Sequence, residues 1–179
     1  MRHFFLMLFL VSSILGAALI GRPPHSSLAA PTSPPVPVPA PTDNETSSDI
    51  TGVVAEGIHP DSVICRFSMH GDHVHVSSTP PRSASGHGWW VNGNCWATHA
   101  VVTVQLQQYY DDGRWRNVGA PGQATVRSGG GAGNRATGCV TCTSNDMTSW
   151  RSVIDVDLVG IPDTPGKYTT PSQTIACRH

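Results

Sequence analysis

The sequence predicts an all-β fold, an Ig-like antiparallel β-sandwich, with a small β-barrel as the alternative. Two long runs alternate apolar and polar residues with a period of two, as half-buried strands do. No stretch of about a dozen residues has the 3.6-residue periodicity of an amphipathic helix. Short candidate strands are separated by Gly, Pro, Asn and Asp, which is typical of sandwiches. Strand number alone does not decide between a sandwich and a barrel.

Residues 1–30 have the order of an export signal. A basic start at Met1–His3 precedes an apolar run over residues 4–21, and Ala29 and Ala30 offer cleavage sites. The run is also close to the roughly twenty residues that span a bilayer, so an uncleaved N-terminal anchor is the alternative. We therefore expect a secreted, extracellular protein, or one held outside a membrane by this segment alone.

Residues 31–49 predict a Pro-rich, disordered linker. Six prolines lie within residues 31–42, and they exclude a helix or a central strand. Residues 43–49 are small, polar and acidic. Such a composition favours an extended spacer without a core of its own. Residues 50–179 then form a single β domain that is long enough to bury a core.

The elements of this domain follow in chain order. The first long strand lies within residues 95–110, and the residues of Asp111–Gly113 tolerate the turn that leads back into Arg114–Val118. The second long strand covers residues 149–160, with its apolar residues on one face. Shorter strands are expected at Val63–Ser68, His73–Ser77, Ala124–Arg127, Arg135–Val140 and Gln173–Cys177.

The charge balance argues against polyanionic partners. There are 11 Lys and Arg against 12 Asp and Glu, which gives a formal net charge of -1, and the basic residues form no run. Nucleic acid is therefore not expected as a partner, because its capture needs several clustered cations. A polybasic contact with a membrane surface is excluded for the same reason.

The five cysteines of an exported chain are interpreted first as disulfide formers. Sequential pairing joins Cys65 to Cys95 and Cys142 to Cys177, and each loop of roughly thirty to thirty-five residues contributes on the order of 3 to 4 kcal/mol. Cys139 is then the spare thiol, although other connectivities stay open. Cys139 and Cys142 also have the C-x-x-C spacing of a redox pair, or of two zinc ligands that would join His73 and His75.

One pattern of cysteines and short motifs covers the C-terminal part of the chain. It consists of Cys142, the stretch Trp150-Arg-x-Val-x-Asp-Val-Asp157, residues 165–171 and a closing Cys177. The pattern resembles that of small secreted actinomycete proteins without an assigned activity. The resemblance covers roughly residues 60–179 and implies an exported, disulfide-bonded β domain. That family has one cysteine before the Trp-Arg strand, whereas this chain has both Cys139 and Cys142.

The densest group of titratable residues is His70-Gly-Asp72-His73-Val-His75. If residues 73–76 form a strand, His73 and His75 point to the same face and can share one divalent ion. His70 or Asp72 would complete the ligand set, and these donors suit zinc or copper. The alternative is a solvent-exposed strand or loop of histidines that needs no cofactor.

Two adjacent aromatic residues, Trp89 and Trp90, lie among glycines in an expected loop. At most one of two neighbouring rings is easily buried there, so an exposed ring is available to stack on a sugar or to anchor a protein partner. A carbohydrate-binding role through this pair is therefore one hypothesis.

No catalytic motif is complete in the sequence, so we expect no enzymatic activity. The leading hypothesis is an exported, non-catalytic protein that binds an extracellular protein or glycan. The first alternative is a copper or zinc protein that uses His70, Asp72, His73 and His75. The second alternative is a carbohydrate-binding module that uses Trp89 and Trp90.

Overall fold

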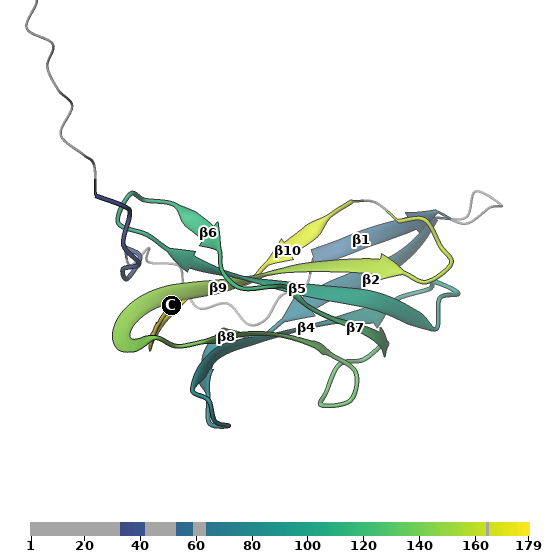
Figure 1. Ribbon diagram of the computed structural model, residues 1–179. Helices are drawn as coiled ribbons and strands as arrows, with labels where there is room; N and C mark the ends of the chain where they lie inside the picture. The colour runs from purple at the N-terminus through teal and green to yellow at the C-terminus, as the bar shows by residue number, and fades with distance from the viewer. Residues whose placement is uncertain (1–32, 42–52, 59–63, 164) are drawn as a thin grey trace, which may run out of the picture. The chain divides into compact units, whose positions relative to one another are not determined.

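The computed structural model describes residues 33–41, 53–58, 64–163 and 165–179 of the chain. These residues form strands and no helix, which confirms the predicted all-β class (Figure 1). No apolar helix of membrane-spanning length occurs in the described part of the chain. The predicted export signal or anchor over residues 1–30 lies outside the described residues.

The strands form two antiparallel sheets. The first sheet has five strands: β1 (Val53–Ile58), β2 (Ile64–Gly71), β3 (His75–Ser77), β4 (Ser83–Asn92) and β8 (Ala136–Thr141). The second has six: β5 (His99–Tyr109), β6 (Trp115–Asn117), β7 (Gly122–Arg127), β9 (Ser144–Leu158), β10 (Lys167–Thr169) and β11 (Gln173–Arg178). The Ig-like topology stays a prediction, while the two-sheet, antiparallel architecture is confirmed.

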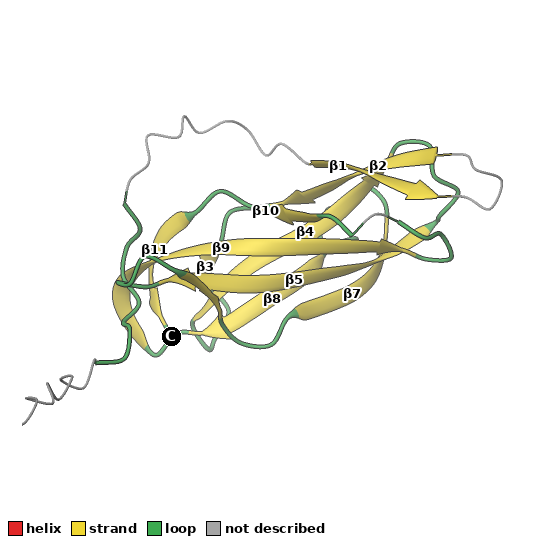
Figure 2. Ribbon diagram, turned by 90° about the horizontal axis from the view of Figure 1, so that it is seen from above, coloured by secondary structure: helices red, strands yellow, loops and turns green. Residues whose placement is uncertain are grey.

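The long strands β5 and β9 are neighbours in the second sheet and run side by side through the domain (Figure 2). Their alternating patterns place Val102, Val104 and Ile154 in the core with no exposed surface. Met69 and Trp90 of the first sheet belong to the same core. Burial of such side chains contributes about 1.5 to 3 kcal/mol each, so the period-two pattern also contributes directly to stability.

Strand β4 occupies the segment around Trp89 and Trp90, which the sequence analysis takes as a loop. Its inward positions include Gly86 and Gly88, where a strand pattern would have large apolar residues. A Cβ atom on Gly88 would lie 2.9 Å from Val104 Cγ2, because the second sheet already fills that space. The small residues therefore allow the two sheets to approach closely. The short strands β1 and β10 are also absent from the sequence prediction.

Two disulfides confirm the sequential pairing. Cys65 is bonded to Cys95, and Cys142 is bonded to Cys177. Cys139 is an exposed free cysteine, as expected for the spare thiol. Because Cys142 is already bonded to Cys177, the C-x-x-C spacing provides neither a redox pair nor two thiolate ligands for zinc.

Residues 34–41, which we call the strap, correct the prediction of a free linker. They belong to the same compact unit as the rest of the domain. The strap lies along the end of β5 and the first half of β9, and its main-chain bonds are Val38 N–H to Tyr109 O, Asp111 N–H to Val36 O and Ser149 N–H to Val38 O. The rest of the predicted linker, residues 31–32 and 42–49, lies outside the described residues.

The order of residues in the strap explains this pairing. Val36, Val38 and Ala40 alternate with prolines. In an extended chain every second N–H points to the same side, so the prolines leave no unpaired donor on the other side. The three N–H groups donate to Asp111 Oδ1 at 3.0 Å, Tyr109 O at 3.0 Å and Ser149 Oγ at 2.8 Å. A sequence that excludes a central strand thus fits an outer one.

Candidate metal centre

A break in the first sheet positions the candidate site. Strand β2 pairs with β4 as far as Gly88, and β3 resumes the same edge of β4 at Ser85. Between them, Asp72 N–H donates to His87 O at 3.2 Å, and His87 N–H donates to Asp72 Oδ1 at 2.7 Å. The carboxylate therefore replaces a main-chain carbonyl at this point of the ladder. Val74, which is fully buried, holds the connecting segment in the core.

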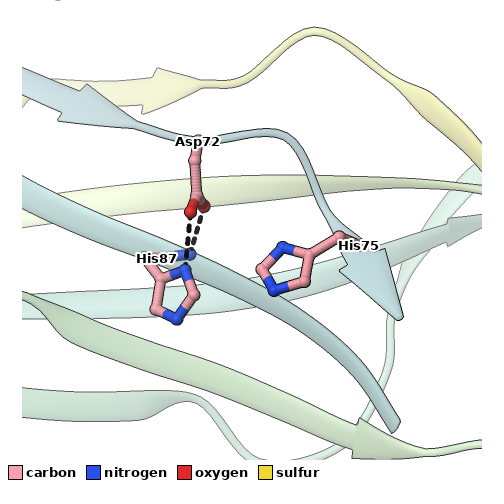
Figure 3. Close-up of side chains that lie close together, drawn as sticks. All are labelled: Asp72, His75 and His87. Atoms are coloured by element: carbon pink, nitrogen blue, oxygen red, sulfur yellow. Dashed lines mark hydrogen bonds and ion pairs between the residues drawn. The ribbon is translucent and has the colours of Figure 1, made fainter. Parts of the chain in front are cut away.

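The same carboxylate binds the imidazole of His87. His87 Nδ1 lies 2.6 Å from Asp72 Oδ2, and Figure 3 shows both contacts of Asp72 converging on His87. A carboxylate accepts the hydrogen, so Nδ1 carries it and the neutral ring keeps a lone pair on Nε2. His87 is 7% exposed, and its ring is held in one orientation by this bond. An oriented imidazole of this kind is typical of a metal ligand or a general base.

His75 comes from the start of β3 and faces the His87 ring (Figure 3). The ring centroids are 5.3 Å apart, and the planes are inclined by 26°. His75 Nδ1 lies 3.3 Å from the carbonyl oxygen of His73, which can only accept a hydrogen. His75 is exposed, so its remaining nitrogen is accessible from solvent.

Asp72, His75 and His87 each offer a ligand atom, and these atoms all lie within 4.8 Å of one another. Two ligands of a tetrahedral zinc ion, each about 2.1 Å from the metal, lie about 3.4 Å apart. The three side chains would therefore need to move by less than about 1 Å to share an ion. Two imidazoles and one carboxylate are donors that suit zinc or copper, and the site leaves a position for water or a further ligand.

The site also perturbs the acidity of its carboxyl group. Burial by itself would raise the pKa of Asp72. The hydrogen bonds from the His87 side chain and main chain, together with the charges of His87 and His75, outweigh burial and hold the pKa of Asp72 below its ordinary value. The carboxylate is therefore ionised at neutral pH and available to a cation.

The structure brings together only part of the predicted ligand set. Asp72 and His75 belong to the group, whereas His70 and His73 do not. The His70 ring stacks on Trp89 with centroids 5.9 Å apart, and its Nε2 bonds to Ser68 Oγ at 2.7 Å. Strand β3 starts at His75 and not at residue 73, so the strand face that His73 and His75 were expected to share does not form. The carbonyl oxygen of His73 instead contacts His75 Nδ1.

His87 is a member of the group that no sequence pattern indicates. The residue lies in β4, 15 positions after Asp72, in a glycine-rich segment without an apolar pattern. The only signal was an isolated histidine between Gly86 and Gly88. Its proximity to Asp72 results from strand pairing, which local patterns do not report.

Trp89 and Trp90 do not present two free rings. Trp90 has no exposed surface, and its indole nitrogen donates to Val126 O at 3.1 Å. Trp89 is partly exposed, but it stacks on His70. A Cβ on Gly130 would lie 2.7 Å from the Trp89 ring, so the loop between β7 and β8 also contacts it. The hypothesis of a sugar platform at this pair is corrected for Trp90, which is part of the core.

Comparison of the chain with protein families, curated proteins and solved structures finds no match. The resemblance to small secreted actinomycete proteins therefore stays a prediction. Any function has to be inferred from the residues and geometry of the site itself.

Proposed function

We propose that this protein is an exported β domain that binds a zinc or copper ion through Asp72, His75 and His87. The observation that carries the proposal is the convergence of one ligand atom from each of the three side chains to within 4.8 Å. For Asp72 and His87 to bind the same ion, the ion would take the place of the hydrogen between Asp72 Oδ2 and His87 Nδ1, two atoms that lie 2.6 Å apart in this structure.

Two further features support this proposal. The sheet break places Asp72 and His87 by main-chain bonds, so the donors are held before any ion arrives. Export is supported by the two disulfides, which form and persist in oxidising compartments, and by the signal-like pattern of residues 1–30. An exported protein meets zinc and copper outside the cell. Because the donors are already held in place by the fold, the ion would bind without further folding of the chain.

The test uses the untagged full chain, stripped with a chelator and titrated with zinc and with copper. We expect about one ion per chain by metal analysis and a higher thermal midpoint, because an ion that binds only the folded state stabilises it by mass action. Stabilisation at a hundredfold excess over Kd is about 2.7 kcal/mol. His75→Ala should weaken binding by more than about 100-fold, since even the outer partners of metal ligands contribute about 10- to 100-fold.

His73→Ala is the matched control, because it removes a histidine two residues away whose side chain is outside the group. It should bind the ion as the unmodified chain does. Equal losses in His73→Ala and His75→Ala would contradict the assignment, and a chain that binds neither ion would exclude the proposed function.

A further inference from the structure

A second binding feature of the domain lies where the pairing of β5 with β9 ends. The two strands pair as far as Gln108 and Trp150. At the next position Tyr109 pairs with β6 and Ser149 pairs with β11. The sides on which Tyr109 and Ser149 face each other therefore need another partner. We call this place the fork, and it is formed by Tyr109, Asp111 and Ser149.

Val38 of the strap supplies that partner (the strap is dark blue in Figure 1). Its N–H donates to Tyr109 O at 3.0 Å, and its carbonyl oxygen accepts from Ser149 N–H at 3.2 Å. Val38 thus stands between β5 and β9, where a direct bond from Ser149 to Tyr109 would continue their ladder.

Two side chains of the fork extend this pairing along the strap. Asp111 N–H donates to Val36 O at 2.9 Å, and Asp111 Oδ1 accepts from Val36 N–H at 3.0 Å. Ser149 Oγ accepts from Ala40 N–H at 2.8 Å. The fork therefore binds an N–H group at every second residue of the strap. It needs none at the residues between, which proline can occupy.

These contacts can also be made by a strap from another molecule. All of these hydrogen bonds use main-chain groups of the strap, so none depends on how the strap is joined to the rest of the chain. Prolines at alternate positions favour the extended conformation before binding, which lowers the entropic cost of binding. The fork contains no residue of the candidate metal centre, so the two proposals fail independently.

We propose that the fork also binds the strap of a second copy of this chain, so that two copies exchange straps. Every copy carries the required alternation, and no other stretch of the sequence has proline at every second position as residues 35–41 do. Exchange of an identical element is a low-cost route to a dimer, because the same contacts form again.

The length of chain between the strap and β1 allows this exchange. Residues 42–52 separate the two, and a segment of this length reaches at most about 40 Å. That reach is more than twice the radius of gyration of roughly 15 Å that is typical of a domain of this size. The strap can therefore reach the fork of a neighbouring copy as well as its own.

The first experiment tests whether the fork accepts a strap from outside. The probe is a peptide of residues 33–41, titrated into the full chain with Val38→Pro, whose own strap has lost a donor. We expect saturable binding, with NMR shifts at the amides of Asp111 and Ser149. The unmodified full chain should bind the peptide at least about tenfold more weakly, because its own strap competes at an effective concentration in the millimolar range. This second titration does not depend on the folding of a variant.

Two altered peptides test the alternation. A peptide with Val38→Pro should bind at least about tenfold more weakly, because Tyr109 O then lacks its donor. A peptide with Pro37→Ala keeps every hydrogen bond and should bind less than about fivefold more weakly, since only the preset conformation is lost. Equal binding of these two peptides, or no binding of the unmodified peptide to either chain, would overturn the fork as a site for a second strap.

The second experiment tests the second copy as the occupant. The full chain with Val38→Pro keeps its fork, and the full chain with Asp111→Ala keeps its strap. Mixed well above the Kd of the peptide, they should form a mixed dimer in native mass spectrometry. Asp112→Ala is the matched control for Asp111→Ala, because Asp112 pairs with Arg116 and not with the strap. It should give at least about fivefold less mixed dimer.

Peptide binding without a mixed dimer would overturn the second copy as the occupant of the fork. A mixed dimer that forms equally with Asp111→Ala and Asp112→Ala would overturn the exchange of straps, because the second variant leaves the fork intact. Circular dichroism of each variant checks that it is folded.

Discussion

At the scale of single residues, Asp72 combines a structural role with a chemical one. One carboxylate oxygen accepts the main-chain N–H of His87, and the other binds its ring. Removing the charge thus affects the sheet and the candidate metal site together. A functional residue of this kind cannot be separated from the fold by substitution alone, so its contribution has to be measured against pH.

Asp72→Asn should reduce the free energy of unfolding by about 1.5 to 3 kcal/mol at neutral pH, the range for hydrogen bonds to a charged group. The pKa of Asp72 is lower in the folded chain than its ordinary value. Its ionised form therefore stabilises the fold above the unfolded-state pKa, and this contribution is lost as the pH falls through the folded-state pKa. Urea denaturation of both chains from pH 7 to pH 3, without metal, measures the difference, which should shrink on acidification.

Asp112→Asn is the control for this pH series. Its carboxylate pairs with Arg116 at the surface, 2.6 Å away, and such exposed pairs contribute about 0 to 1 kcal/mol. A loss in Asp72→Asn that is as small as this, or that stays constant down to pH 3, would contradict the role of the Asp72 charge.

At the scale of elements, β5 and β9 could be predicted from sequence and β4 could not. Burial on one face determines the alternation in β5, and that pattern is visible locally. In β4 the opposite sheet occupies the space that apolar side chains would fill, so the inward positions are small and the pattern disappears. His87 lies in this unpredicted strand. Asp72 and His75 were found because they lie in one short histidine-rich segment.

Gly88→Ala tests this explanation of β4. The added methyl group would lie 2.9 Å from Val104 Cγ2 and 3.0 Å from Ile154 Cγ2, so the core has to shift. We expect the free energy of unfolding to fall by about 1 to 3 kcal/mol, as in other overpacked cores. Gly133→Ala is the matched control, because a Cβ there meets nothing within 4 Å, and its effect should stay within about 0.5 kcal/mol. Equal stability of the two variants would show that the sheets do not need the glycine.

At the scale of the whole chain, the strap extends the folded unit beyond the boundary that the sequence predicts. Its composition indicates an isolated linker because the prolines exclude a helix or a central strand. The strap residues are held by main-chain hydrogen bonds to β5 and β9, which a side-chain pattern does not reveal. The same limitation applied to His87, so the features missed in this chain are those that strand pairing creates.

Deleting residues 1–41 should expose amides that deleting residues 1–32 leaves protected. Asp111 N–H and Ser149 N–H donate to carbonyl oxygens of the strap, so hydrogen exchange at both should accelerate in the shorter chain only. The amide of Val118, which donates to Leu106 O, is the internal control and should not change. Unchanged exchange at Asp111 and Ser149 would mean that the strap does not stay bound in solution.

The prolines of the strap also determine what its outer side can do. Pro35, Pro37 and Pro39 replace the residues whose N–H groups would point away from the domain. A foreign strand that approaches this border therefore finds carbonyl oxygens but no donors, and a regular ladder cannot form. Natural sheets use proline in this way to prevent edge-to-edge aggregation. A protein that begins at residue 50 would lack this protection, and it would expose the main-chain groups of β5 and β9 as a template for self-association.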